Sequence, residues 1–264
     1  MDYKTVNKKL WNDKVDIHID SDFYSVNEFI GGKKMLNSIE LDLLGDVRGK
    51  SILHLQCHFG QDSIELSRMG AAVTGVDLSD KAIDKAGWLA KECGTDTKFV
   101  CSDIYDAPNH ITEKFDIVFT SYGTVGWLPD MDKWATVVNH FLKPGGFFVF
   151  AEFHPVVWMM DYDFQKIEFS YFNQGPIVEE LEGTYTDRNA ELKNKEISWN
   201  HNIAEVLGSL LEQGLELEAF REFDYSPYDC FKHTIKVEEK KYRIKDLGGK
   251  LPMVYALKLN KSKA

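Results

Sequence analysis

The sequence predicts an α/β fold in which a mostly parallel sheet carries helices on both of its faces. Three observations lead to this prediction. A strand–turn–helix–strand unit of about 30 residues, the size of a parallel crossover, lies between Ser51 and Ser79. The alternation of strand and helix patterns then continues to residue 152. The segment 201–260 ends the chain with a helix, a strand, a charged loop and a last strand, rather than with further parallel units.

The first unit is the best defined part of the sequence. Residues Ser51 to Gln56 form a short apolar run with the length of a buried strand. Residues Gln61 to Met69 fit a short helix, and Gly70 suits its carboxyl-terminal cap. Residues Ala72 to Val76 predict a second buried strand, which ends in Asp77. The turn between the first strand and the helix therefore lies beside the acidic end of the second strand.

This arrangement indicates nucleotide binding. A helix that starts directly after a strand points backbone N–H groups at a ligand, and an acid at the end of the next strand can accept from ribose hydroxyls. Asp77 has the position of that acid, although it could also simply cap the following turn. A pyrophosphate needs several glycines in the turn. Gln56 and His58 occupy the earlier positions and only Gly60 is a glycine, which favours a cationic or zwitterionic group instead.

The remaining elements place polar residues at strand ends. The predicted elements are a helix over 80–93 capped by Ser79, strands over 98–101, 115–121 and 147–152, a helix from Asp130 through Leu142 and a turn over 143–146. Ser102 and Asp103 follow the third strand, Ser121 and Tyr122 the fourth, and His154 the fifth. Ligands bind outside the carboxyl ends of strands in open α/β sheets, so these residues are candidates for one site.

The turn LHLQCHFG, the following acid Asp77 and the later pattern LKPGGF resemble the class I S-adenosylmethionine-dependent methyltransferases. The resemblance covers residues 45–152 well and residues 200–260 by element order. It implies a Rossmann-like, seven-stranded methyltransferase sheet, mostly parallel, with a C-terminal antiparallel hairpin and helices on both faces. The sequence departs from the family's turn because His54 replaces its acidic residue, and Gln56 and His58 replace two of its three glycines.

The resemblance also implies a role for each strand end in holding S-adenosyl-L-methionine. The expected contacts run from the amino acid end of the cofactor through the ribose and adenine to the transferred methyl group. They are Leu55, Gln56, His58 and Gly60 for the amino acid end, Asp77 and Leu78 for the ribose, Ser102, Asp103 and Ile104 for the adenine, and Ser121 and Tyr122 near the methyl.

The implied reaction is a direct in-line displacement, in which a small-molecule acceptor attacks the sulfonium methyl. His154 is a candidate general base, although a histidine that binds substrate or caps the strand is an equally physical interpretation. Tyr24 is a candidate cofactor contact in an N-terminal cap, against the alternative of a core aromatic.

We expect a single domain made of four parts. These are an N-terminal helical cap (1–45) with a helix over 33–44, a cofactor-binding core (46–152), a substrate-side insertion (153–200), and a C-terminal helix and hairpin (201–264). The insertion is rich in aromatic residues, and we expect short antiparallel strands at 168–171, 177–181 and 196–199. Its aromatic side chains suit either a substrate pocket or a homodimer interface. We expect a helix over 201–213 capped by Asn200, and strands over 215–225 and 253–260.

Composition excludes several classes of protein. The formal charge of −11 and the isoelectric point near 5.2 argue against nucleic acid as a partner. No apolar run approaches the length of a membrane span, and the first residues lack the apolar core of a signal peptide. The four cysteines show no paired spacing, so we expect reduced thiols in a cytoplasmic protein and no metal site.

Two other functions remain open from the sequence. An NAD-dependent oxidoreductase would share the sheet and the ribose acid, but it would need more glycines in the turn. A non-catalytic S-adenosylmethionine-binding protein is consistent with the altered turn. The acceptor and the attacked atom do not follow from these motifs, because one fold serves many acceptors.

Overall fold

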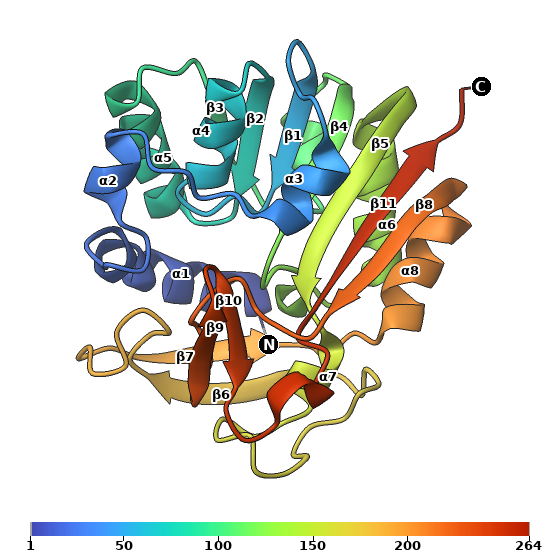
Figure 1. The fold of residues 1–264 in the computed structure, drawn as a ribbon. Helices are drawn as coiled ribbons and strands as arrows, with labels where there is room; N and C mark the ends of the chain where they lie inside the picture. The colour runs from blue at the N-terminus through green and yellow to red at the C-terminus, as the bar shows by residue number, and fades with distance from the viewer. Residues whose placement is uncertain (1, 264) are drawn as a thin grey trace.

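The computed structural model describes residues 2–263 and is built around one twisted sheet (Figure 1). Within these residues the main sheet has seven strands in the order β3-β2-β1-β4-β5-β11-β8. Their bounds are β1 Ser51–Leu55, β2 Ala72–Asp77, β3 Lys98–Cys101, β4 Phe115–Ser121, β5 Leu142–Phe153, β8 Leu215–Phe223 and β11 Val254–Lys261. The predicted strands are therefore present, with ends shifted by a few residues.

The first five strands are parallel, which brings their carboxyl ends to one edge. Leu53 of β1 pairs with Thr74 of β2 on one side and with Val118 of β4 on the other. The chain runs outward from β1 to β3 and then returns to β4 on the opposite side of β1. This reversal between β1 and β4 is the position at which open α/β sheets bind their ligands.

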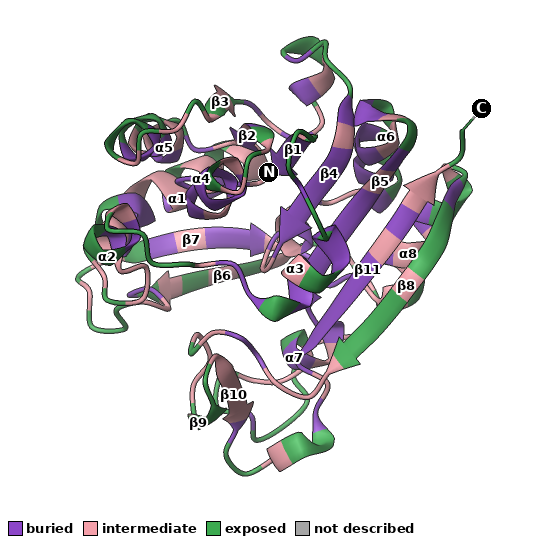
Figure 2. Cartoon of the chain, turned by 45° about the horizontal axis from the view of Figure 1, so that its top comes forward, coloured by how far each residue is buried: buried purple, intermediate pink, exposed green. Residues whose placement is uncertain are grey.

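Helices cover both faces of the sheet, as predicted. One face packs against α3 Ser38–Leu44, α4 Gln61–Arg68 and α5 Asp80–Glu92, and the other against α6 Met131–Phe141 and α8 Ile203–Glu212. Figure 2 shows that β1, β4, β5 and β11 are buried between these layers, whereas the edge strand β8 is largely exposed. The closely packed core between these layers holds the strand ends in fixed positions.

The last two strands of the sheet run against the first five. β11 pairs antiparallel with β5 on one side and with β8 on the other. This antiparallel end confirms the fold that the family resemblance implied and differs from the further parallel units of a dehydrogenase domain.

The segments outside the core gather at the carboxyl edge of the sheet. α1 Tyr3–Ile19 lies across this edge and contacts α5 and β7, while α2 Val26–Ile30 follows it (Figure 1). Two small antiparallel pairs lie at the same end, β6 Ile177–Glu182 with β7 Lys193–Ser198, and β9 Thr234–Glu238 with β10 Lys241–Ile244. Among the expected insertion strands, 177–181 and 196–199 correspond to this first pair.

Several expectations about local structure are wrong. The strand expected at 168–171 does not form, and the helix expected over 33–44 begins only at Ser38. The cap of α8 is Asn202, whose side chain accepts the Glu205 N–H, because the Asn200 amide instead donates to the Trp158 and Ser170 carbonyls. The loop 226–252 contains the β9–β10 hairpin. Its residues are mostly exposed, so it lacks the hydrophobic alternation that predicts strands.

The turn expected at residues 143–146 lies inside β5. Gly146 runs so close to β4 that an added Cβ would lie 2.8 Å from the Asp116 carbonyl oxygen. The register between β4 and β5 shifts between Phe115 and Ile117. The glycine pair therefore permits an irregular strand that follows α6 directly, and no separate turn forms there.

Candidate active site

The turn after β1 has three residues in backbone conformations that glycine adopts most readily, although only one of the three is a glycine. Gln56, His58 and Gly60 all have positive φ, at 57°, 52° and 80°. Non-glycine residues adopt this region at an energetic cost and do so most often at functional sites. At Gly60 an added Cβ would lie 2.5 Å from the Phe99 ring, so only glycine fits there. The substitutions change the side chains of the turn and preserve its backbone path.

The side chains of Gln56 and His58 each leave a buried polar atom without a partner. Gln56 Nε2 donates to the Thr124 carbonyl 2.8 Å away, which bridges the point between β1 and β4 where the strand order reverses. His58 Nε2 lies 3.1 Å from Nδ1 of His18 on α1. Gln56 Oε1 and His58 Nδ1 are buried and have no hydrogen-bond partner among the described residues. These two atoms are free to bind polar groups of a ligand at the turn.

Asp77 lies at the end of β2, beside this turn. Its two carboxylate oxygens accept from the backbone N–H groups of His58 and Ser79, at 2.8 Å and 2.9 Å. Burial raises the pKa of Asp77, and these backbone hydrogen bonds oppose the rise. A carboxylate offers about four acceptor sites, so two remain for the hydroxyls of a ribose. The geometry fits the ribose acid that the sequence predicted.

Asp103 follows β3 and is contacted by the N-terminal helix. Its Oδ1 accepts from the Tyr105 N–H at 3.0 Å and from Lys4 Nζ at 2.9 Å. Its Oδ2 has no hydrogen-bond partner within residues 2–263, so it could accept from an adenine amino group. The Lys4 side chain is 44% exposed and that of Asp103 12%, so the ion pair joins an exposed ammonium to a largely buried carboxylate.

The other predicted cofactor contacts differ in what they can offer. Leu55 is fully buried, and Ile104 is buried in the core cluster that packs against α6. Ser102 is buried, and its N–H donates to the Asp77 carbonyl. Leu78 keeps part of its accessible surface. Leu55 could therefore meet a ligand only through its backbone, whereas Leu78 could pack on a ring.

The end of β4 connects the turn to a group of acids that the sequence analysis missed. Ser121 Oγ donates to Asp62 Oδ2 at 3.1 Å and lies 3.5 Å from His54 Nε2. Tyr122 has a positive φ of 43°, and its hydroxyl donates to Glu40 Oε2 at 2.8 Å. A strained residue at a strand end that aims a hydroxyl at a buried carboxyl is typical of a functional site.

The carboxyl groups of Glu40 and Asp62 are deep in the protein. Burial, reinforced by the charge of Asp62, raises the pKa of Glu40 to about 7. Burial, reinforced by the charge of Glu65, raises the pKa of Asp62 to about 6. The pattern Asn37-x-x-Glu40 at the start of a helix was the one sequence signal for Glu40, and the Glu40 carboxylate does accept the Asn37 N–H at 2.6 Å.

Glu152, also missed as a functional residue, organises the loop after β4. Its buried carboxylate accepts from the backbone N–H groups of Thr124 and Val125 and from the Thr124 hydroxyl, at 2.7, 3.2 and 2.8 Å, and also from the Gly123 N–H. Burial raises the pKa of Glu152, and these hydrogen bonds oppose that rise. The Glu152 side chain thereby holds residues 123–125, which border the predicted position of the methyl group.

His154 caps a short helix in this structure. Its Nδ1 accepts from the Val156 N–H at 3.2 Å, at the start of α7 Pro155–Trp158, and its Nε2 lies 3.0 Å from Glu222 Oε1. Burial lowers the pKa of His154, so the neutral ring is favoured near pH 7. Both ring nitrogens are engaged, which matches the capping alternative. The general-base role stays a prediction.

The predicted N-terminal cap contact, Tyr24, lies in an aromatic group above the turn. Its hydroxyl bonds that of Tyr185 from the insertion, and its ring packs on His18, His58 and Phe59 at centroid distances of 5.4, 5.7 and 4.6 Å. Tyr24 keeps part of its accessible surface. It therefore links the N-terminal segment, the turn and the insertion, and its contact with the cofactor stays a prediction.

Comparison with known proteins identifies the core. Residues 52–146 match a family model described as a methyltransferase domain. These residues belong to that family. An uncharacterized methyltransferase of Synechocystis is 31% identical over 132 residues, which cover 49% of this chain and 60% of that protein. A ubiquinone biosynthesis O-methyltransferase of Chromobacterium violaceum is 27% identical over 144 residues, which cover 53% of this chain and 56% of the relative.

Solved structures extend the likeness to the whole methyltransferase fold. An S-adenosylmethionine-dependent methyltransferase from Clostridium acetobutylicum has a TM-score of 0.57 and 18% identity, and covers 97% of this chain and 98% of its own. A geranyl diphosphate C-methyltransferase from Streptomyces coelicolor has a TM-score of 0.61 and 14% identity, and covers 99% and 98%. The Rossmann-like, seven-stranded fold that the family resemblance implied is confirmed, and residues 52–146 match the methyltransferase domain.

The residues at the carboxyl edge fit the cofactor of this family. Asp77 and Asp103 retain free acceptor sites, and buried Gln56 Oε1 is an unpartnered acceptor beside the turn. Within residues 2–263, no group of three or more His, Cys, Asp or Glu is arranged to hold a metal ion. All four cysteines are free. None of the helices in the described part of the chain has the length and apolarity needed to cross a membrane.

Proposed function

We propose that the protein transfers a methyl group from S-adenosylmethionine to a small-molecule acceptor. The observation that carries this proposal is the preserved positive-φ path of Gln56, His58 and Gly60 beside Asp77. S-adenosylmethionine, when bound, supplies a methyl group already activated by a sulfonium. The protein would then contribute mainly alignment and the exclusion of water.

Each strand end has a distinct task in this proposal. The turn from Leu55 to Gly60 would hold the amino acid end, with Gln56 Oε1 as an acceptor for its ammonium group. Asp77 would hold the ribose and Asp103 the adenine amino group, once Lys4 has moved aside. The loop fixed by Glu152 would place Ser121 and Tyr122 beside the transferred methyl.

Calorimetric titration with S-adenosylhomocysteine, with NADH in parallel, tests the proposal. We expect micromolar affinity for S-adenosylhomocysteine and none for NADH, because the turn lacks the glycines that a pyrophosphate needs. Asp77→Ala should weaken the binding of S-adenosylhomocysteine at least a hundredfold, since two charge-assisted hydrogen bonds to its ribose are lost. Asp80→Ala is the matched control, because this neighbouring carboxylate is exposed and bonds Lys8 and Asn12.

The outcomes separate the candidate functions. No binding of S-adenosylhomocysteine would mean that Gln56 and His58 close the site, and the proposal would fail. Binding without turnover on any acceptor would favour the non-catalytic S-adenosylmethionine-binding protein. Binding of NADH alone would favour the oxidoreductase.

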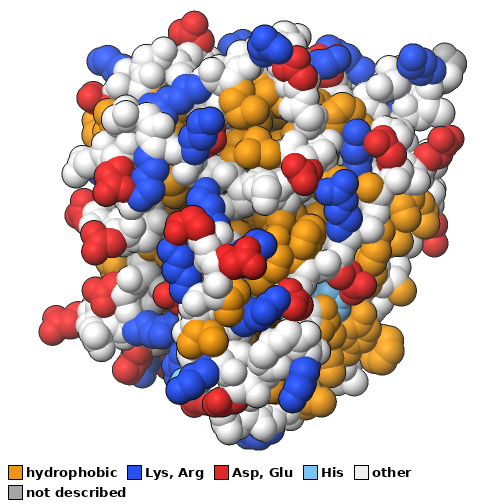
Figure 3. Space-filling model, viewed as in Figure 1, with side chains coloured by type: hydrophobic (Ala, Val, Ile, Leu, Met, Phe, Trp, Pro, Cys, Tyr) orange, Lys and Arg blue, Asp and Glu red, His pale blue; other side chains and the backbone are white. Residues whose placement is uncertain are grey.

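We also propose that the exposed edge of the sheet forms a homodimer contact. Leu217 and Phe220 of β8 and Leu211 of α8 are exposed apolar side chains. Apolar side chains reach the surface along the right-hand edge of Figure 3, where Figure 1 places β8 and α8. Light scattering after gel filtration measures the mass directly: a monomer would contradict the proposal. The cytoplasmic location stays a prediction.

A further inference from the structure

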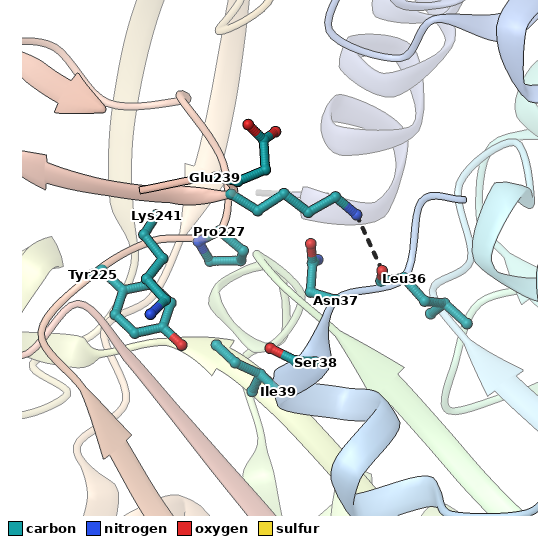
Figure 4. A pocket seen from close by; sticks show the side chains of 9 residues that line it. Leu36, Asn37, Ser38, Ile39, Tyr225, Pro227, Glu239 and Lys241 are labelled. Carbon is teal, nitrogen blue, oxygen red and sulfur yellow. Dashed lines mark hydrogen bonds between the residues drawn. The ribbon is translucent and has the colours of Figure 1, made fainter. Parts of the chain in front are cut away.

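A pocket of about 200 Å³ lies between α3 and the β9–β10 hairpin (Figure 4). One wall is the segment before and at the start of α3, including Asn37 and Ser38, and the other includes Lys240 and Lys241 at the tip of the hairpin. None of the predicted cofactor contacts lines this pocket. Sites for drug-sized ligands have volumes of about 300–1,000 Å³, so this pocket suits a smaller molecule.

The tip of the hairpin has one more lysine than it has glutamates. Lys241 pairs with Glu238 at 2.7 Å, and Lys236 pairs with Glu239, which also lines the pocket. Lys240 forms no ion pair with any residue that the structure describes. The pocket therefore carries one ammonium without a counter-ion, which attracts an anion and repels a protonated amine.

The Lys240 ammonium is fixed in place and has a donor to spare. Its Nζ donates to the carbonyls of Met35 and Leu36, at 3.1 Å each, and thereby ties the hairpin to the segment before α3. Burial raises the pKa of Asp62, and the Lys240 charge opposes that rise from beyond ion-pair distance. An ammonium has three N–H donors, so one remains for a ligand in the pocket.

Asn37 offers a hydrogen-bond acceptor on the opposite wall. Its Nδ2 donates to Glu40 Oε1 at 3.1 Å and to the Tyr228 hydroxyl at 2.9 Å. Its Oδ1 is buried and has no hydrogen-bond partner within residues 2–263. Figure 4 shows the Asn37 amide extending from the start of α3 into the space below the hairpin. An amide oxygen accepts but cannot donate, so it selects a ligand that carries an N–H or O–H group.

Apolar groups form the rest of the lining that bears on the ligand. The side chains of Leu36 and Ile39 are buried at the start of α3. The Tyr225 ring lies on the other side, with the Lys241 ammonium 5.2 Å from its centroid. Such walls favour a ligand with a short hydrocarbon part.

These features together restrict the chemistry of the ligand. The Lys240 ammonium requires a negative group, and Asn37 Oδ1 requires a donor. Sulfate supplies the charge but neither a donor nor a hydrocarbon part, and a simple fatty acid lacks the donor. A carboxylate with an N–H or O–H group on a short apolar chain meets all three requirements.

We propose that this pocket binds a small aliphatic carboxylate that also carries an N–H or O–H donor, as a 2-hydroxy acid or an amino acid does. The carboxylate accepts from Lys240, the donor bonds Asn37 Oδ1, and the chain packs on Ile39 and Tyr225. The ligand thus adds a second bridge between the hairpin and α3 beside the one that Lys240 makes. This inference does not depend on the proposed methyl transfer.

Calorimetry on the purified protein tests the inference. The probes are L-leucine and 2-hydroxy-4-methylpentanoate. They are compared with 4-methylpentanoate, which lacks the donor, and with 3-methylbutan-1-ol and 3-methylbutylamine, which lack the carboxylate. We expect at least one of the two acids to bind with a Kd of about 1 mM or tighter, and about fivefold better than 4-methylpentanoate. The alcohol and the amine should not bind at about 10 mM.

Three variants locate the binding. Lys240→Met removes the ammonium and keeps most of the chain, and should weaken the acid about tenfold. Lys245→Met is the matched control, because this exposed lysine follows the same hairpin and does not line the pocket, so binding should be unchanged. Ser38→Phe places a ring at the exposed rim of the pocket and should abolish binding, which keeps the test decisive if Lys240→Met does not fold.

Each titration is repeated on the protein saturated with S-adenosylhomocysteine. Binding that persists supports a separate pocket. Competition would place the acid at the amino acid end of the cofactor site and would overturn the inference. If S-adenosylhomocysteine itself does not bind, the methyltransferase proposal fails, and the titrations without it still decide whether the pocket binds the acid.

Other results would also overturn the inference. These are no binding of either acid at about 10 mM, equal binding of 4-methylpentanoate, and unchanged binding in Ser38→Phe. Equal weakening by Lys240→Met and Lys245→Met would show an effect of net charge rather than of the pocket. Binding of leucine alone would identify an amino acid site, and binding of the hydroxy acid alone a hydroxy acid site; both support the proposed chemistry.

Discussion

The two sides of the carboxyl edge differ in where their polar partners come from. On the cofactor side, Asp77 is held by backbone N–H groups of Ser79 and of His58, two and 19 residues away. On the Glu40 side, Tyr122 reaches Glu40 across 82 residues, and Asn37 reaches Tyr228 across 191. The contacts of the predicted ribose acid therefore come from one local unit, whereas the surroundings of Glu40 are assembled from distant segments.

This difference has an electrostatic consequence. Backbone N–H groups stabilise the charged form of Asp77 and oppose the effect of burial on its pKa. Glu40 and Asp62 have fewer such donors, and burial raises the pKa of Glu40 to about 7 and that of Asp62 to about 6. Burial thus raises the pKa of carboxyl groups on both sides, and on the Glu40 side it brings two of them into the range where they can exchange a proton near neutral pH.

The largest expected effect tests the close packing at Gly60, in the turn of the cofactor side. Gly60→Ala should destabilise the fold by about 4 kcal/mol, because alanine is strained at φ 80° and its Cβ would lie 2.5 Å from the Phe99 ring. Gly94→Ala is the matched control. Gly94 has φ 64° but no atom within 4 Å of an added Cβ, so the loss should be about 1 kcal/mol. Urea denaturation measures both, and equal losses would show that the ring contact is unimportant.

An intermediate effect tests the burial of Glu40. The pKa of Glu40 is raised from 4.5 to about 7, so the folded protein holds a proton that the unfolded chain has lost between these pH values. The free energy of unfolding should therefore fall by about 3 kcal/mol as pH rises from about 4.5 to about 7. Glu40→Gln should remove this contribution and leave the one from Asp62, whose pKa is raised to about 6, whereas Glu28→Gln, at an exposed surface pair, should keep both.

Urea denaturation at several pH values measures this effect. A wild-type curve without this component, unchanged by Glu40→Gln, would mean that Glu40 is charged in the folded protein at low pH. The Glu40 side would then resemble the cofactor side, and the electrostatic contrast between them would disappear.

The smallest expected effect tests whether His154 stabilises the fold or contributes to cofactor binding. His154→Gln should lower the free energy of unfolding by about 1 kcal/mol, because the cap of α7 and the Glu222 contact are weakened. Affinity for S-adenosylhomocysteine should stay within about twofold, since a capping histidine has no contact with the cofactor. Urea denaturation and calorimetry measure the two quantities, and a large loss of affinity would instead make His154 part of the cofactor side.

The cofactor half of the molecule could be predicted because its signals are local. The run Ser51–Leu55, the helix after Gly60 and the strand ending in Asp77 carry their own periodicity and turn residues. The positions of Asp103 and Tyr122 followed from the alternation of strands and helices, since the carboxyl ends of parallel strands lie at one edge of the sheet. The surroundings of Glu40 lack such signals. Glu40 and Tyr228 are adjacent only after α3 and the segment after β8 have packed together.

By itself the sequence determined the order of strands and helices in the core, the position of Asp77 at the end of a strand beside the turn, and the resemblance of the core to methyltransferases. Hydrophobic period and turn chemistry act within about ten residues and so can be read along the chain. Only the tertiary structure decided that Gln56 and His58 adopt the backbone of glycines, that His154 is engaged on both nitrogens, and that Glu40 and Asp62 share a buried site. The physical reason is that side-chain partners, burial and the resulting charge states depend on packing between segments that are far apart in the chain.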